Sequence, residues 1–128
     1  MPGIAKVTYV VRSYDEARDW FVDALGFEVL EDTDMGGGKR WLVVAPPGGG
    51  GGALVLGLAA DAAQAERVGN QTGGRVAFFL EVPSFAAAHA RMQAAGVRFL
   101  EEPRHEPYAT VAVFEDLYGN RWDLLEPA

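Results

Sequence analysis

The fold is decided by the stretch Val7-Thr8-Tyr9-Val10-Val11, because its plan recurs in the second half of the chain at Val76-Ala77-Phe78-Phe79-Leu80. Both runs are rich in β-branched and aromatic residues, which favours strands. Each run leads into a segment with helical spacing, and a second strand then follows Gly26 or Gly96. An internal repeat of this kind predicts two copies of one supersecondary unit.

Two helices are predicted from the spacing of their apolar residues. Ser13 followed by Glu16 is a capping-box pattern at the start of the first helix. Gly26 and Gly96 stand where a helix can end in a left-handed residue. His89 lies beside the apolar face of the second helix and is interpreted as a packing or surface histidine. The buried faces are expected to consist of Ala17, Phe21, Ala24 and Leu25 in the first helix and Phe85, Ala88, Met92 and Ala95 in the second.

The remaining strands complete an α+β fold of two βαβββ modules, at about residues 4–58 and 74–126. The linker, at about residues 59–73, could hold a short helix at Ala60–Val68. Residues 1–128 are expected to form a single domain with one curved, mostly antiparallel eight-stranded sheet. Because two helices can cover only one face, the other should enclose a concave cavity. The further strands are expected at Trp41–Ala45, Ala53–Leu58, Thr110–Glu115 and Arg121–Leu125.

Composition excludes several classes of function. The chain has 128 residues, no cysteine and a net charge of −7, so thiolate chemistry is absent and nucleic acid should be repelled. No apolar run is long enough to cross a membrane, and the first residues do not resemble a signal peptide. We therefore expect a soluble cytoplasmic protein, and the abundance of Ala, Gly and Arg indicates a GC-rich bacterial genome.

Three stretches resemble the vicinal-oxygen-chelate superfamily, which contains glyoxalases, bleomycin-resistance proteins and extradiol dioxygenases. The segment Ile4–Ala17 looks like its first strand and helix, and Leu25-Gly26-Phe27-Glu28 looks like its helix-to-strand junction. The most specific match is the closing hairpin, Phe114-Glu115-Asp116-Leu117-Tyr118-Gly119-Asn120-Arg121-Trp122-Asp123-Leu124. The resemblance covers nearly the whole chain and implies the fold derived above.

In metal-using members of that superfamily, four inward positions carry His and Glu ligands. The resemblance places Lys6, Leu56, Arg75 and Asp123 at those positions. Charged lysine and arginine offer no lone pair, and their charge repels a divalent cation. Lys6 and Arg75 are instead expected to pair with Asp123, because buried charges need partners. We therefore predict no metal and no cofactor, which puts the metal-dependent chemistry of the superfamily in doubt.

Strand alternation selects the residues expected to line the cavity. If Lys6 and Thr8 point inward, then Arg75 and Phe79 should do so in the repeated strand, leaving Trp122 for the helix side. Aromatic rings on or next to strands complete the set as candidate cavity walls. The predicted ligand-binding residues are Lys6, Thr8, Trp41, Arg75, Phe79, Tyr108, Phe114 and Asp123.

Two functions are compatible with these residues. The first is a metal-free protein resembling the bleomycin-resistance branch, which would sequester an aromatic or planar ligand such as an antibiotic. The acidic surface would favour a cationic ligand, whereas Lys6 and Arg75 would favour a carboxylate or phenolate. The alternative is a metal-dependent lyase or ring-cleaving dioxygenase, with ligands such as His105 and Glu102 or Glu106. The sequence favours binding over catalysis, and the resemblance implies a homodimer.

Overall fold

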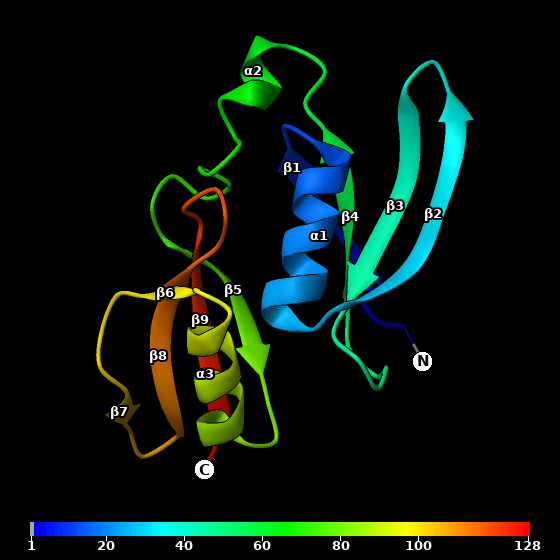
Figure 1. The fold of residues 1–128 in the computed structure, drawn as a ribbon. Helices are drawn as coiled ribbons and strands as arrows, with labels where there is room; N and C mark the ends of the chain where they lie inside the picture. Colours follow the sequence, from blue (N-terminus) through cyan, green and yellow to red (C-terminus); the bar gives the residue numbers. More distant parts are fainter. Residues whose placement is uncertain (1) are drawn as a thin grey trace. The chain divides into compact units, whose positions relative to one another are not determined.

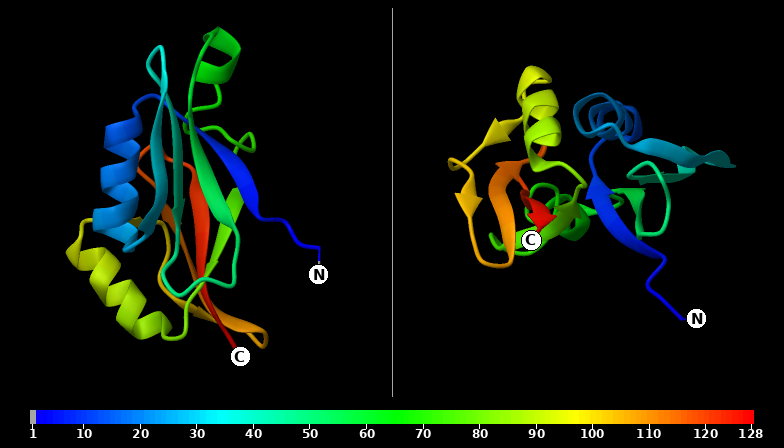
Figure 2. Two further views of the ribbon diagram at one scale, coloured as in Figure 1. Left: turned by 90° about the vertical axis from the view of Figure 1, so that its right-hand side faces the viewer. Right: turned by 90° about the horizontal axis from the view of Figure 1, so that it is seen from below.

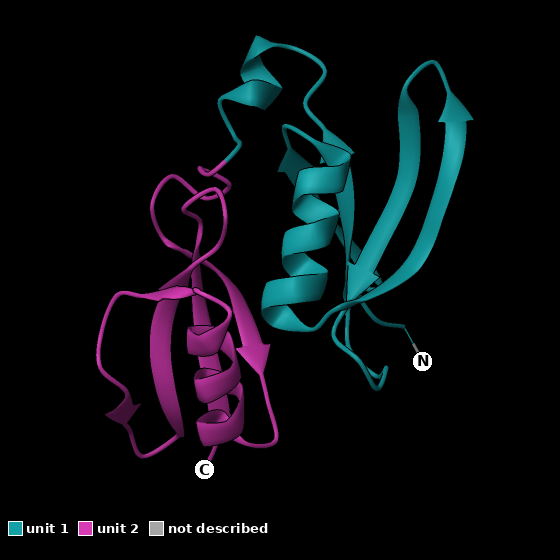
Figure 3. Ribbon diagram, viewed as in Figure 1, with its two compact units in different colours: residues 1–68 teal, residues 69–128 magenta. Residues whose placement is uncertain are grey.

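The computed structural model describes residues 2–128, whose contacts divide them into two compact units. Unit one runs up to Val68 and unit two begins at Gly69 (Figure 3). Figure 1 labels the elements of both units. Unit one contains β1 (Lys6–Val11), α1 (Tyr14–Leu25), β2 (Glu28–Gly36), β3 (Lys39–Ala45), β4 (Ala53–Leu58) and α2 (Ala62–Ala65). Unit two contains β5 (Val76–Glu81), α3 (Phe85–Ala94), β6 (Arg98–Phe99), β7 (Arg104–His105), β8 (Ala109–Glu115) and β9 (Arg121–Pro127).

The sheet of unit one has the strand order β1-β4-β3-β2, in which β1 and β4 are parallel and the other pairs are antiparallel. Helix α1 lies along one face of this sheet (Figure 2). Its start follows the predicted cap, since the Ser13 side chain accepts a hydrogen bond from the Glu16 backbone N–H. Gly26 ends the helix with φ = 70°, a left-handed conformation that costs glycine little.

The core of unit one is aromatic where α1 meets the sheet. The Phe21 ring lies 5.3 Å from the Tyr9 ring and 5.3 Å from the Phe27 ring, between centroids. Tyr9 and Phe21 are both fully buried, and Leu56, the β4 residue paired with Tyr9, is buried with them. Side chains at alternate positions of β1 and β4 therefore anchor α1, and those between them face the other side.

The sheet of unit two has the order β5-β9-β8-β6, with β7 also paired to β8. The α+β class and the two βαβββ modules are confirmed. The strands, however, hydrogen-bond in two sheets of four and five strands, where one sheet of eight was expected. The additional strand is Arg104–His105, which was not among the expected strands and pairs with β8 at Val111 and Thr110. The short helix in the linker is confirmed as α2.

A row of packed aromatic rings lies between α3 and the unit-two sheet. His89 is confirmed as a packing residue, because its ring lies 5.2 Å from Phe85 and 4.3 Å from Phe99. The row continues from Phe99 to Phe114 at 5.7 Å and from Phe114 to Trp122 at 5.7 Å. Figure 2 shows α3 along this face of β8 and β9. The prediction that Phe114 lines a ligand cavity is therefore wrong, since its side chain is fully buried in this core.

Asp116 holds the closing hairpin together. One of its oxygens, Oδ1, accepts the backbone N–H groups of Tyr118 and Asn120, both at 3.0 Å. The other, Oδ2, accepts from Asn120 Nδ2 at 3.1 Å and from Trp122 Nε1 at 3.0 Å. Asp116 is only 6% exposed. If its side chain were removed, these donors would therefore have little water to replace the lost acceptor.

Replacing Asp116 with alanine should lower the free energy of unfolding by at least about 2 kcal/mol, because it leaves buried donors unpaired. Urea denaturation followed by tryptophan fluorescence measures this loss. Glu115→Ala is the matched control, since the ion pair of the Glu115 side chain with Arg98 is long, at 3.9 Å. Equal stability of the two variants would show that the Asp116 hydrogen bonds do not stabilise the hairpin.

Candidate functional site

Strand pairing places two of the predicted ligand-binding residues together on unit two. Phe79 on β5 is the register partner of Asp123 on β9. Their neighbours in the same strands, Leu80 and Trp122, are buried against α3, so Phe79 and Asp123 face away from the helix. We call this side of the unit-two sheet the distal face. It is formed by Phe79, Arg104, Val111, Val113, Asp123 and Leu125.

The carboxyl of Asp123 is the least satisfied polar group described. Its Oδ1 is buried and has no hydrogen-bond partner among residues 2–128. Burial raises the pKa of Asp123; the charge of Arg104 lowers it and that of Glu101 raises it. Leaving such an oxygen without a donor is costly, which makes the group ready to accept a hydrogen bond from a bound molecule.

Beside Asp123, Arg104 is held by two carboxylates. Its Nε donates to Glu101 Oε1 at 2.8 Å, and Nη1 donates to Glu106 Oε1 at 3.1 Å. These hydrogen bonds, with one to Tyr108, raise the pKa of Arg104. Burial acts to raise the pKa of Glu101, but hydrogen bonds from Arg104 and the Val113 N–H outweigh it and leave that pKa lowered.

Exposed rings lie at this part of unit two. The Phe79 side chain is 64% exposed, and that of Tyr108, in the turn between β7 and β8, is 65% exposed. An apolar ring this exposed gains little from folding and is available to a ligand. The distal face thus combines a phenyl ring, a desolvated carboxyl and a guanidinium whose charge is paired with two carboxylates. This combination suits non-covalent binding of a flat molecule.

The residues predicted on unit one lie on the sheet face away from α1. Lys6 and Thr8 are exposed and pair with Ala53 and Val55 of β4. Trp41 is 37% exposed, and its Nε1 donates to Glu31 Oε2 at 2.7 Å. Participation of Lys6, Thr8 and Trp41 in binding stays a prediction.

Two predicted details of the inward positions are wrong. Leu56 lies on the helix side, fully buried opposite Tyr9, because the assumed alignment slipped by one residue and Val55 takes the inward position. Arg75 is exposed and lies one residue before β5. Within the described part of unit two it makes no ion pair with Asp123, whose pKa is shifted by Arg104 and Glu101.

The four positions that the resemblance assigns to metal ligands do not fit a divalent cation in this chain. Of the four, only Asp123 offers an oxygen ligand, since the others are Lys6, Val55 and Arg75. The alternative set around His105 is not assembled either. His105 Nδ1 is 3.3 Å from Thr110 Oγ1, and residues 2–128 contain no group of three or more His, Asp or Glu side chains placed to hold a metal.

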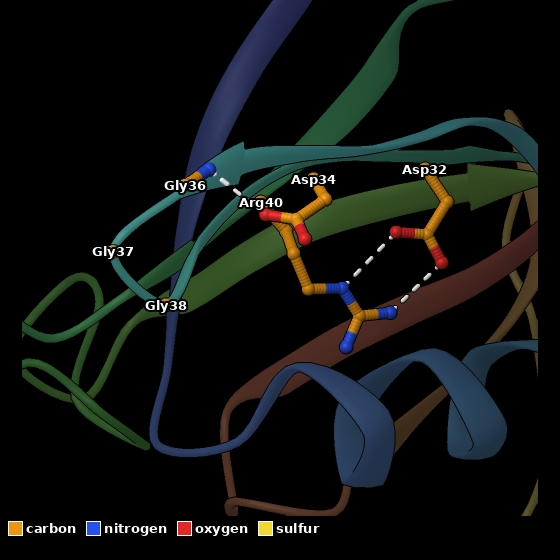
Figure 4. Close-up of a pocket in the computed structure, with 6 residues that line it drawn as sticks. All are labelled: Asp32, Asp34, Gly36, Gly37, Gly38 and Arg40. Atoms are coloured by element: carbon orange, nitrogen blue, oxygen red, sulfur yellow. Dashed lines mark hydrogen bonds and ion pairs between the residues drawn. The ribbon is translucent and has the colours of Figure 1, made fainter.

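A hollow lies at the tip of the β2–β3 hairpin, lined by Asp32, Asp34, Gly36, Gly37, Gly38 and Arg40 (Figure 4). Two of its charged residues, Arg40 and Asp32, are already paired with each other. Arg40 donates to both oxygens of Asp32, at 3.0 and 2.8 Å, and to Asp15 at 2.7 Å. Hydrogen bonds from Arg40 lower the pKa of both carboxyls. We interpret the ion pairs of Arg40 as structural contacts that join the hairpin to α1, since the Arg40 backbone N–H also donates to the Tyr14 hydroxyl.

With this geometry established, comparison with known proteins identifies the family. The family model described as "Glyoxalase/Bleomycin resistance protein/Dioxygenase superfamily" matches residues 3–124. The chain belongs to the glyoxalase/bleomycin resistance protein/dioxygenase superfamily. The resemblance predicted from the opening strand and the closing hairpin is thereby confirmed.

Three relatives are similar to this chain in sequence or structure over nearly its whole length. An uncharacterized protein of Shewanella frigidimarina (strain NCIMB 400) is 48% identical over 125 residues, covering 97% of this chain and 93% of the relative. The crystal structure of UcmS2 is similar with a TM-score of 0.83 and 30% identity, covering 98% of each chain. TnmS3, an antibiotic binding protein from Streptomyces sp. CB03234, has a TM-score of 0.79 and 28% identity, covering 100% of this chain and 98% of its own.

Sequence reasoning missed Arg104 and Glu101, because both lie outside the strands and helices that the sequence predicts. The available signal was their spacing: Glu101 and Arg104 bracket Pro103, and a carboxylate and a guanidinium three residues apart can pair in a tight turn.

Replacing Asp123 with asparagine should raise the melting temperature at neutral pH by a few degrees. Because the pKa of folded Asp123 is raised, folding favours the protonated carboxyl, so ionisation destabilises the protein as pH rises through the unfolded and then the folded pKa. Calorimetry at neutral and acidic pH measures the difference, which should vanish in acid. If the variant were less stable than the wild type at neutral pH, the ionised Asp123 carboxyl would not destabilise the folded protein.

Proposed function

We propose that this protein binds a flat aromatic small molecule without a metal and sequesters it, an antibiotic being one candidate. The single observation that carries the proposal is that Phe79 and Asp123 are neighbours in strand register on the distal face. Phe79 is 64% exposed, and Oδ1 of Asp123 has no hydrogen-bond partner among the described residues. A ring and a hydrogen-bond acceptor side by side can hold a planar ligand and fix its orientation. The similarity to TnmS3, an antibiotic binding protein, supports the same function.

The proposal includes a cytoplasmic location and a homodimeric state in a bacterial cell. No helix of residues 2–128 is long and apolar enough to cross a membrane. The relatives reported above with a source come from bacteria. Further ligand contacts from Lys6, Thr8, Trp41, Arg75 and Tyr108 belong to the proposal, whereas Phe114 does not.

Phe79→Ala should weaken binding about 2- to 10-fold, the value expected from losing one aromatic contact of about 0.5–1.5 kcal/mol. The measurement is tryptophan-fluorescence titration with a panel of aromatic antibiotics. Because Phe79 is exposed, the variant should fold normally.

Leu30→Ala is the matched control, an apolar side chain that is 53% exposed on β2 of unit one. It should leave binding unchanged. Two results count against the proposal: no saturable quenching of the wild type by any compound in the panel, or equal losses in the two variants.

Metal content separates binding from the metal-dependent alternative. Because the donor set at the family's metal positions is limited to Asp123, we expect purified protein to hold metal well below one ion per chain. Elemental analysis after growth with Zn, Ni, Mn and Fe checks this. A stoichiometric ion in the wild type that is absent from the Asp123→Asn variant would favour a lyase or dioxygenase.

A further inference from the structure

The charge of the ligand can be read from the groups around Asp123. The sequence left this open, because the acidic surface favours a cation and the predicted Lys6 and Arg75 favour an anion. On unit two, the charges that shift the pKa of Asp123 are those of Arg104 and Glu101, and Arg75 is not among them. The electrostatics of the distal face therefore depend on the Arg104 cluster.

Arg104 is not available to bind an anionic group. Glu101 and Glu106 accept from its guanidinium at 2.8 and 3.1 Å, and Tyr108 hydrogen-bonds to it as well. Counting Asp123, three carboxylates surround one guanidinium. An anion placed here would meet excess negative charge, whereas a cation would be attracted.

Asp123 Oδ1 needs a hydrogen-bond donor. The register partners of Asp123 are Val113 on β8 and Phe79 on β5, neither of which can donate through a side chain. A charge-assisted hydrogen bond from a positively charged N–H group is the strongest way to satisfy a buried carboxylate. The exposed Phe79 ring beside it offers a surface for a flat cation, because an aromatic face attracts positive charge.

We propose that the distal face of unit two selects a flat aromatic cation, whose N–H group donates to the Asp123 carboxylate while its ring system lies on Phe79. This inference rests on the proposed function and names the class of ligand, an aromatic amine or amidine protonated at neutral pH. Arg104 fixes Glu101 and Glu106 around the site and does not contact the ligand's charge.

The affinity should depend on pH with a defined sign. A cation prefers ionised Asp123, so binding weakens as pH falls through the raised pKa of this carboxyl. The titratable groups facing Asp123 are Arg104 from β7 and Glu101 from the segment before it, while Val113 and Phe79 do not titrate. The raised pKa of Arg104 keeps it charged throughout, and the lowered pKa of Glu101 favours its ionised form.

Two tricyclic probes of opposite charge test the proposal by isothermal titration calorimetry. Proflavine is a flat cation with N–H donors, and anthraquinone-2-sulfonate is an anion of similar ring area. The wild type should bind proflavine at least about tenfold more tightly than the sulfonate, and Asp123→Asn should lose about tenfold or more in proflavine affinity. The variant should also lose the decline in affinity at acidic pH.

Asp23→Asn is the matched control, because it removes the same charge from an exposed position on α1 of unit one. It should bind proflavine like the wild type, apart from a small change at low salt. An equal loss in Asp23→Asn and Asp123→Asn would overturn the inference by showing that net charge alone attracts the dye.

The remaining outcomes distinguish the two proposals. Preferential binding of the sulfonate, or proflavine binding unaffected by Asp123→Asn, overturns the cation inference and leaves flat-ligand binding intact. If the wild type binds neither probe and no antibiotic of the panel, the proposed function fails and the inference fails with it. A proflavine preference that disappears only in Asp123→Asn supports both.

Discussion

The alternation of side chains along β9 is the constraint on which the rest of unit two depends. Trp122 and Leu124 are buried, 3% and 0% exposed, while Asp123 between them points to the opposite side. Because the pleat has a period of two, the packing of the aromatic row fixes where the carboxyl lies. The same residues that stabilise the fold therefore present Asp123 next to Phe79, and no loop needs to move to assemble this part of the site.

The hairpin before β9 fixes the register of this strand, and with it the face on which each side chain lies. Asp116 accepts hydrogen bonds from two backbone N–H groups of the turn and from the Trp122 ring, so turn and strand are bound to one carboxylate. A slip of one residue would expose Trp122 and bury Asp123 against α3, which both the lost ring contacts and the buried charge oppose. The most family-specific stretch of the sequence thus acts through strand register, and the proposed binding chemistry follows from that register.

Much of the fold was accessible from the sequence, because helix caps and strand alternation are local properties. Ser13, Gly26 and the placing of Phe79 and Trp122 on opposite faces were predicted by such rules. The errors have non-local causes. Phe114 was assigned to the cavity because an aromatic residue on a strand can face either side, and its contact with Trp122 across β8 and β9 decides the matter. The Glu101–Arg104 pair depends on a two-residue strand that propensity alone cannot detect.

The tip of the β2–β3 hairpin has a practical consequence. Gly36, Gly37 and Gly38 all have positive φ, and a Cβ built on any of them would touch no atom within 4 Å. The backbone there is strained for single side chains, yet the surrounding space is empty, so exchanging the whole tip for a longer peptide disturbs no packing. An epitope or fluorophore-acceptor tag could be grafted at this point, giving a reporter on unit one that leaves the distal face of unit two unaltered in sequence.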